Sequence, residues 1–136
     1  MATVSTAVAR FRLVFNVPLP ALESCKSAIF AAGAGRYPGP GEYTECCWTV
    51  IGTGQFRPGP AANPHLGKPG ELESVQEARV ETLCVGEDVA RKAVAALKSY
   101  VLVQLQPLLP TLAHRCSTGR IRTKNLSYSV HRMEDF

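Results

Sequence analysis

The residues best suited to contact a ligand lie in one short run near the middle of the chain. Gly52 and Gly54 flank Thr53, and Arg57 follows three residues later. Glycines let backbone amides approach an anion closely, and an arginine offers paired N–H donors to a phosphate or carboxylate. The spacing is neither a Walker loop nor a dinucleotide fingerprint, and a β-bulge or hairpin bend would use the same glycines. The run therefore indicates either a contact for a small anion or a bend.

The cysteines and histidines do not combine into a catalytic or metal-binding set. Cys46 and Cys47 are adjacent, so a strand would direct them to opposite faces, and buried apolar cysteines are expected there. The three histidines, His65, His114 and His131, have no acidic or histidine partner at a regular ligand spacing. The sequence predicts no catalytic residue, no metal and no cofactor. His65 is the histidine of most interest because it lies in a proline-rich loop.

Three charged residues with alternating signs share one side of an expected strand. Glu77, Arg79 and Glu81 occur at every second position. Such a row usually faces solvent, but opposite charges meeting across an oligomer interface would give the same pattern. These three residues are therefore the candidate oligomer interface.

Hydrophobic periodicity predicts the elements that position these side chains. Strands are expected over residues 10–17, 46–51 and 75–85, and helices over 20–33 and 87–98. One more strand would complete a split β-α-β arrangement. Two segments could supply it.

The two candidates for the last strand differ in position. Residues 101–106 alternate between aliphatic and glutamine side chains, and residues 127–132 form a second, weaker alternating segment. The segment 59–70 contains three prolines, which lack the amide hydrogen of a central strand, so it is expected to be a loop.

Composition fits one domain in a reducing compartment. The chain has 136 residues, of which 46% are hydrophobic, and its five cysteines have no regular spacing, which argues against a disulfide framework. The apolar run 101–113 is too short to span a membrane. A cytoplasmic location is expected. The arginines and hydroxyl residues of segment 1–17 leave a mitochondrial presequence as the alternative.

The positive charge is concentrated at the C-terminal end. The net charge is +4, and residues 100–136 carry five basic against two acidic side chains. These basic residues lack interleaved aromatics and any nucleic-acid motif. A solvated basic tail is predicted, and nucleic acid is not an expected partner.

Four motifs, in this order, make residues 10–98 resemble the YqfO family: AAGAGR at 31–36, GTGQFRP at 52–58, ANPHLG at 62–67 and EARVE at 77–81. In longer members, the Ngg-interacting-factor-three-like proteins, this domain is inserted into a metal-binding body. Those proteins are homologues of type-two GTP cyclohydrolase, and the body that carries their metal ligands is missing from this sequence. The resemblance implies a CutA-like or PII-like ferredoxin fold that trimerises through its sheets.

The sequence departs from the family after the second helix. The family usually continues with His-Pro-Tyr-Glu-Glu-Pro, and one codon spelling of that segment, read one base later, encodes the residues found at 121–126. We hypothesise that residues 99–120 translate a retained intron that shifts the reading frame. Segment 131–136 again resembles the family's last strand.

The expected architecture is α+β, a ferredoxin-like split β-α-β sandwich with an atypical or disrupted last strand. The expected divisions are a flexible N-terminus at 1–9, the domain at 10–98 and an atypical segment at 99–136. The expected function is a non-catalytic ligand-binding or regulatory module that forms a homotrimer. Alternatives are an accessory or remnant domain of a metal-dependent hydrolase and a structural protein-interaction domain. Candidate contacts for a small anionic ligand are Gly52, Thr53, Gly54, Arg57, Asn63 and His65.

Overall fold

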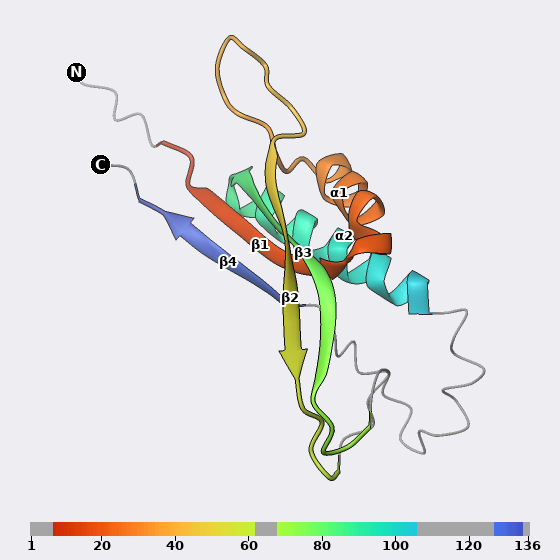
Figure 1. The fold of residues 1–136 in the computed structure, drawn as a ribbon. Helices are drawn as coiled ribbons and strands as arrows, with labels where there is room; N and C mark the ends of the chain where they lie inside the picture. The colour runs from red at the N-terminus through yellow and green to blue at the C-terminus, as the bar shows by residue number, and fades with distance from the viewer. Residues whose placement is uncertain (1–6, 62–67, 106–126, 135–136) are drawn as a thin grey trace.

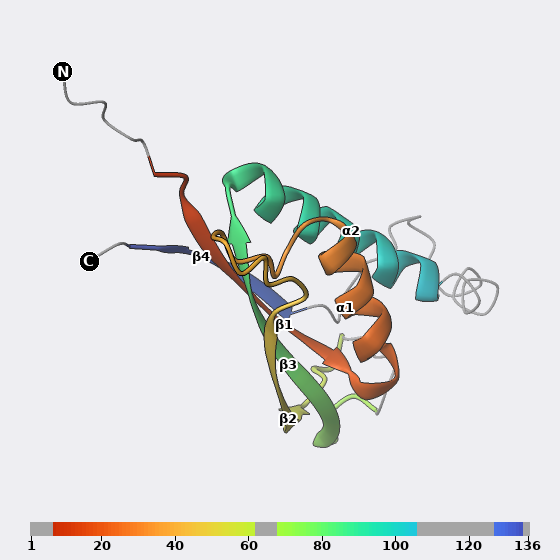
Figure 2. The same cartoon turned by 90° about the horizontal axis from the view of Figure 1, so that it is seen from above.

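A four-stranded antiparallel sheet carries two helices on one of its faces (Figures 1 and 2). The computed structural model describes residues 7–61, 68–105 and 127–134, with the side chains of 101–105 excepted. The strands are β1 (Arg10–Pro18), β2 (Cys47–Phe56), β3 (Glu73–Val85) and β4 (Ser127–Met133). The helices are α1 (Leu22–Ala31), preceded by the 3-10 turn η1 (Leu19–Ala21), and α2 (Glu87–Leu105).

The topology is that of the ferredoxin-like fold, as predicted. The strand order is β2-β3-β1-β4, and every neighbouring pair is antiparallel. β1 and β2, the two strands that α1 connects, are separated in the sheet by β3. This separation defines the split β-α-β arrangement.

The core lies between the sheet and the helices. Alternate residues of β1, namely Leu13, Phe15 and Val17, are almost fully buried, as the period-2 pattern predicts. Cys25 and Ile29 of α1 and Ala93 and Leu97 of α2 face them at helical spacing; the whole core also includes Ala34, Ala78, Val80, Cys84 and Ala90. Because the helices cover only one face, the opposite face of the sheet stays open.

The end of α1 has a specific hydrogen-bonding pattern. Gly33 has φ +106° and its amide donates to Phe30 O, while the amide of Ala34 donates to Ile29 O. These two bonds form a Schellman motif, in which glycine accepts the left-handed conformation without a Cβ clash. Gly33 therefore ends the helix, as predicted.

The last strand is the segment 127–132, extended by one residue. β4 pairs with β1 from Asn16–Ser127 to Arg10–Met133. The competing candidate, 101–106, is wrong, because residues 101–105 continue α2. An established helix adds one hydrogen bond for each residue it fixes, so continuing α2 is favoured over starting a strand. The retained-intron hypothesis concerns residues 99–120, of which 106–120 lie outside the described part of the chain.

β2 and β3 project beyond the rest of the sheet (Figure 1). The last residue of β1, Pro18, pairs with Glu77 of β3, so residues 73–76 of β3 pair with β2 alone. Residues 53–56 and 73–76 thus form a two-stranded arm. Both strands extend further into the arm than predicted. β2 was expected to end at Ile51 and ends at Phe56, and β3 was expected to begin at Val75 and begins at Glu73.

Candidate functional site

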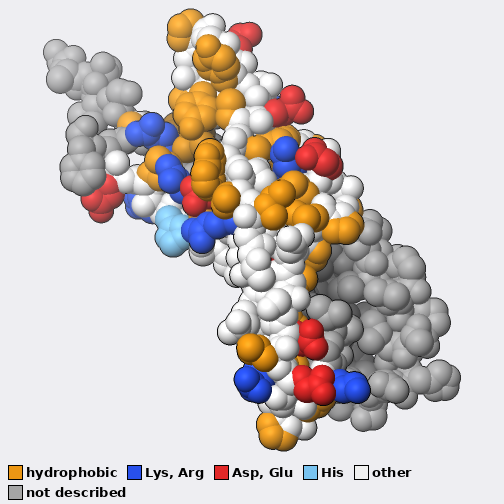
Figure 3. Space-filling model, in the orientation of Figure 1, with side chains coloured by type: hydrophobic (Ala, Val, Ile, Leu, Met, Phe, Trp, Pro, Cys, Tyr) orange, Lys and Arg blue, Asp and Glu red, His pale blue; other side chains and the backbone are white. Residues whose placement is uncertain are grey.

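The open face of the sheet has an apolar half and a charged half (Figure 3). Residues of β2 that point away from the helices include Trp48 and Val50, which are 59% and 42% exposed. Their cross-strand partners on β3 are Glu81 and Arg79. Hydrophobic side chains therefore follow β2, beside charged side chains on β3 and β1. The sequence contained a sign of this strip, since Trp48 and Val50 alternate, but sequence reasoning did not single them out.

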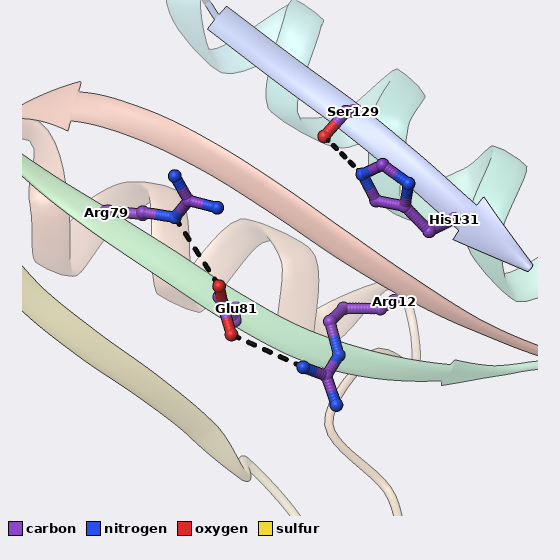
Figure 4. A network of polar contacts seen from close by, with 5 residues as sticks. All are labelled: Arg12, Arg79, Glu81, Ser129 and His131. Atoms are coloured by element: carbon purple, nitrogen blue, oxygen red, sulfur yellow. Dashed lines mark hydrogen bonds and ion pairs between the residues drawn. The ribbon is translucent and has the colours of Figure 1, made fainter. Parts of the chain in front are cut away.

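Two residues of the predicted charge row, Arg79 and Glu81, form a network with Arg12 (Figure 4). Arg12 Nη1 lies 3.5 Å from Glu81 Oε2, and Arg79 Nε lies 3.4 Å from Glu81 Oε1. Glu81 thus sits between two guanidinium groups on the open face. Because the two guanidinium groups are about half exposed, each ion pair contributes little to stability.

A serine and a histidine interact on β4, at the other side of the open face (Figure 4). Ser129 Oγ lies 2.9 Å from His131 Nε2. Spacing i, i+2 on the strand brings the two side chains to the same face, and His131 pairs across the sheet with Arg12. Sequence reasoning treated this histidine as isolated, although the i, i+2 spacing was a usable signal. Both residues are exposed.

The two glycines of the predicted ligand run belong to β2. The register between β2 and β3 is continuous from Cys47–Thr82 to Phe56–Glu73, so no bulge interrupts it. Neither Gly52 nor Gly54 has a positive φ. Successive amides of an extended strand point to opposite sides, so this run does not direct its amides to one point as an anion cradle would. The short bend considered as the alternative is likewise replaced by strand.

The glycines also lie on the same face as the predicted oligomer residues. Gly52 pairs with Glu77, and a Cβ added to Gly54 would lie 3.5 Å from Glu77 Oε2. No atom lies within 4 Å of such a Cβ at Gly52. The structure therefore brings two of the ligand candidates together with one interface candidate. A carboxylate beside Gly54 opposes the binding of an anion at that point.

Arg57 lies at the neck of the loop that connects β2 and β3. Its Nη1 donates to Gly70 O at 2.7 Å, and Gly70 N donates to Pro58 O at 2.7 Å. These bonds close the base of the expected proline-rich loop. The guanidinium is exposed and has further N–H donors. Asn63 and His65 lie outside the described residues.

A second loop, 36–46, is anchored beside the open face. Gly35 N donates to Leu83 O at 2.7 Å, and Cys46 N donates to Gly35 O at 2.9 Å. The buried hydroxyl of Thr82 donates to Cys46 O at 2.8 Å. Between this loop and the sheet lies a cavity of about 340 Å³, whose lining residues are Arg12, Tyr37, Cys46, Cys47, Trp48, Glu81, Thr82, Leu83 and Met133.

The four described cysteines are free thiols of two kinds. Cys46 and Cys47, which were expected to be buried, are only half-buried, whereas Cys25 and Cys84 are fully buried. Burial raises the pKa of both Cys25 and Cys84 from 9.0 to about 11. Within the ranges that the structure describes, histidine, cysteine and acidic side chains form no cluster of three suited to a metal.

The raised pKa values predict a loss of stability in alkaline solution. Unfolded thiols ionise near pH 9.0, while the folded ones resist ionisation until about pH 11. The stability that these two protonated thiols contribute is therefore fully present below pH 9 and is lost as the pH rises toward 11. Between these two pH values, the free energy of unfolding should fall by about 1.4 kcal/mol per pH unit for each thiol. In urea unfolding at several pH values, Cys84→Ala should show a shallower decline than the original chain; parallel declines would contradict the assignment.

The strand order and the two helices on one face of the sheet define an α+β domain of the ferredoxin-like class. No family model matches the chain. The "GTP cyclohydrolase 1 type 2 homolog" of Bacillus subtilis is 36% identical over 118 residues, which cover 82% of this chain and 30% of the relative. Its counterpart in Halalkalibacterium halodurans is 38% identical over 93 residues, covering 68% and 24%. The chain belongs to this YqfO family, as the four motifs predicted.

A solved structure agrees with the sequence relatives. The crystal structure of a Bacillus cereus protein related to NIF3 superposes with a TM-score of 0.63 at 24% identity, over 96% of this chain and 27% of that one. At this identity the match establishes the fold. The chain spans between 17% and 30% of the length of the curated relatives named for the cyclohydrolase homologue. None of the described helices is long and apolar enough to cross a membrane.

Proposed function

We propose that this domain is a regulatory, ligand-binding module that works as a homo-oligomer, assembled through the open face of its sheet. The observation that carries the proposal is the exposed apolar strip of Trp48 and Val50 on a face that no helix covers. A one-sided antiparallel sheet normally presents polar residues to water. Contiguous apolar surface beside charged residues is typical of an association site.

The charges on this face favour a second copy of the same chain as the partner. Arg12 and Arg79 lie beside Glu77 and Glu81, so both signs occur within one patch. Two copies can therefore place opposite charges against one another without a partner of different composition. The family resemblance implies a trimer, which requires a head-to-tail contact repeated around a threefold axis.

Gly52 and Gly54 suit such a contact. They leave β2 without side chains on the open face next to Glu77. A neighbouring backbone can approach this surface more closely than a surface covered by side chains. In this proposal Gly52 and Gly54 belong to the contact between copies. The ligand contacts are Arg57 and the loop that it closes, which includes Asn63 and His65.

The proposed assembly is tested by placing a glutamate on the open face of β2 in one variant and on the opposite face of β2 in another. Val50→Glu is expected to convert the oligomer to a monomer, because the carboxylate must be desolvated in the contact. Ile51→Glu is the matched control, since Ile51 is the next residue, is 59% exposed and points to the other face. Light scattering coupled to size exclusion measures the mass, which should be three times that of the chain for the original protein and the control.

Two results would contradict the proposal. An original chain that remains monomeric at every concentration tested would remove the basis for assembly. Equal masses for both variants, whether monomeric or trimeric, would show that the open face is not the specific contact. Circular dichroism of each variant verifies that the fold is retained.

A further inference from the structure

The cavity between loop 36–46 and the open face has the size of a small-molecule site. Its volume is about 340 Å³, near the lower end of the roughly 300–1,000 Å³ typical of ligand pockets. Its lining includes Cys47 and Trp48 at the start of β2. The arm and the loop closed by Arg57 lie at the end of that strand (Figure 1). None of its nine lining residues is among the predicted ligand contacts.

The lining combines aromatic, aliphatic and charged groups. Tyr37 and Trp48 are 52% and 59% exposed as residues, so a ligand can cover part of their surfaces. Leu83 and Met133 add apolar contacts from β3 and β4. Aromatic rings bind flat ligands by offset stacking or edge-to-face contact. The apolar part of the lining therefore fits a planar ring.

Arg12 gives the lining a cationic contact for an anion. Arg12 and Glu81 both line the cavity, and Glu81 is paired with Arg79 as well as with Arg12. The lining itself holds one guanidinium and one carboxylate, and Arg79, which lies outside the lining, offsets part of the charge of Glu81. The Arg12 side chain is 51% exposed. A guanidinium has five N–H donors in a planar fork, which matches the oxygens of a carboxylate or phosphate.

The cavity is held in shape before any ligand binds. Its loop is attached to β3 through Gly35 and Leu83, and Thr82 holds the carbonyl of Cys46. A preformed pocket loses less conformational entropy on binding than one that must be ordered. The anchoring bonds thus support a binding role for the lining residues.

We propose that this cavity binds a small planar aromatic molecule carrying an anionic group, with the ring against Trp48 and Tyr37 and the anion on Arg12. Mononucleotides and aromatic carboxylates share this chemistry. All lining residues come from one chain, so the site does not rest on the proposed oligomer. Trp48 also belongs to the apolar strip proposed for assembly, so a ligand and a second copy compete for its ring, and the titration below is repeated on Val50→Glu.

The test uses the fluorescence of Trp48, which is the only tryptophan in the sequence. AMP and benzoate are the two probes. AMP tests binding of a mononucleotide, and benzoate tests binding of an aromatic carboxylate. Adenosine and ribose 5-phosphate supply the ring alone and the anion alone. We expect saturable quenching by AMP or benzoate. If AMP binds, adenosine and ribose 5-phosphate should bind at least roughly tenfold more weakly than AMP, because each lacks one of its two contacts.

Variants assign the anion to Arg12. Arg12→Gln should weaken binding of the better probe by roughly tenfold or more, whereas Arg12→Lys should retain part of the affinity because the charge remains. Arg91→Gln is the control, since Arg91 lies on α2 and pairs with Glu87 at 2.6 Å, away from the open face. Failure of both probes to saturate, or equal affinities for Arg12→Gln and Arg91→Gln, would overturn the proposal. Thermal unfolding of each variant verifies that the fold is retained.

Discussion

Replacing Gly35 with alanine is expected to lower the free energy of unfolding by roughly 2–5 kcal/mol, one of the two largest effects that the structure predicts. Gly35 has φ +77°, and a Cβ there would lie 2.8 Å from both the amide nitrogen and the carbonyl oxygen of Cys46. The left-handed conformation costs a non-glycine residue about 1–2 kcal/mol. Displacing the backbone of the adjoining loop adds about 1–3 kcal/mol.

Gly70→Ala separates these two contributions. Gly70 has nearly the same φ, +81°, but no atom lies within 4 Å of a Cβ placed there. Urea unfolding should therefore give a loss of only about 1–2 kcal/mol for Gly70→Ala. Equal losses for the two variants would mean that the contact between Gly35 and Cys46 contributes nothing. The same Gly35 variant should also displace loop 36–46 and reduce probe binding in the cavity.

Truncating Leu97 to alanine is expected to destabilise the domain by about 2–5 kcal/mol. Leu97 of α2 is fully buried and belongs to the core cluster that joins both helices to the sheet. Removing its branched side chain eliminates apolar burial and leaves a cavity that the surrounding strands fill only in part. The change should appear as a lower urea midpoint with an unchanged slope.

Leu72→Ala is the matched control for the core. The same atoms are removed, but Leu72 is 51% exposed and precedes β3. Its unfolding free energy should stay within about 0.5 kcal/mol of the original value. A loss at Leu97 as small as that at Leu72 would contradict the assignment of the core.

The fold could be predicted from the sequence because its main signals are local. Alternation in β1 and helical spacing around Cys25 and Ile29 identify the buried faces directly, and Gly33 identifies the end of α1. The last strand was ambiguous for a physical reason. Residues 101–106 and 127–132 both alternate, and only continuation of α2 decides between them.

The conformation of Gly52 and Gly54 could not be predicted from their identity. Glycine accepts strand, bend and left-handed conformations at similar cost, so the run alone does not select one. Pairing with Glu77 and Val75, more than twenty residues later, decides in favour of strand. The cavity was missed for a related reason, because Arg12, Trp48 and Met133 come together only when β1, β2 and β4 occupy their places in the sheet.

The pairing of β1 with β4 sets an order of events during synthesis. Arg10 pairs with Met133, so the two ends of the described chain meet in one ladder. Contacts between such distant residues slow folding, because a long loop must close before they form. While the chain emerges from the ribosome, β1, β2 and β3 can assemble with both helices well before β4 is available. A domain that folds during synthesis therefore keeps the hydrogen-bonding edge of β1 unpaired until residues 127–133 arrive.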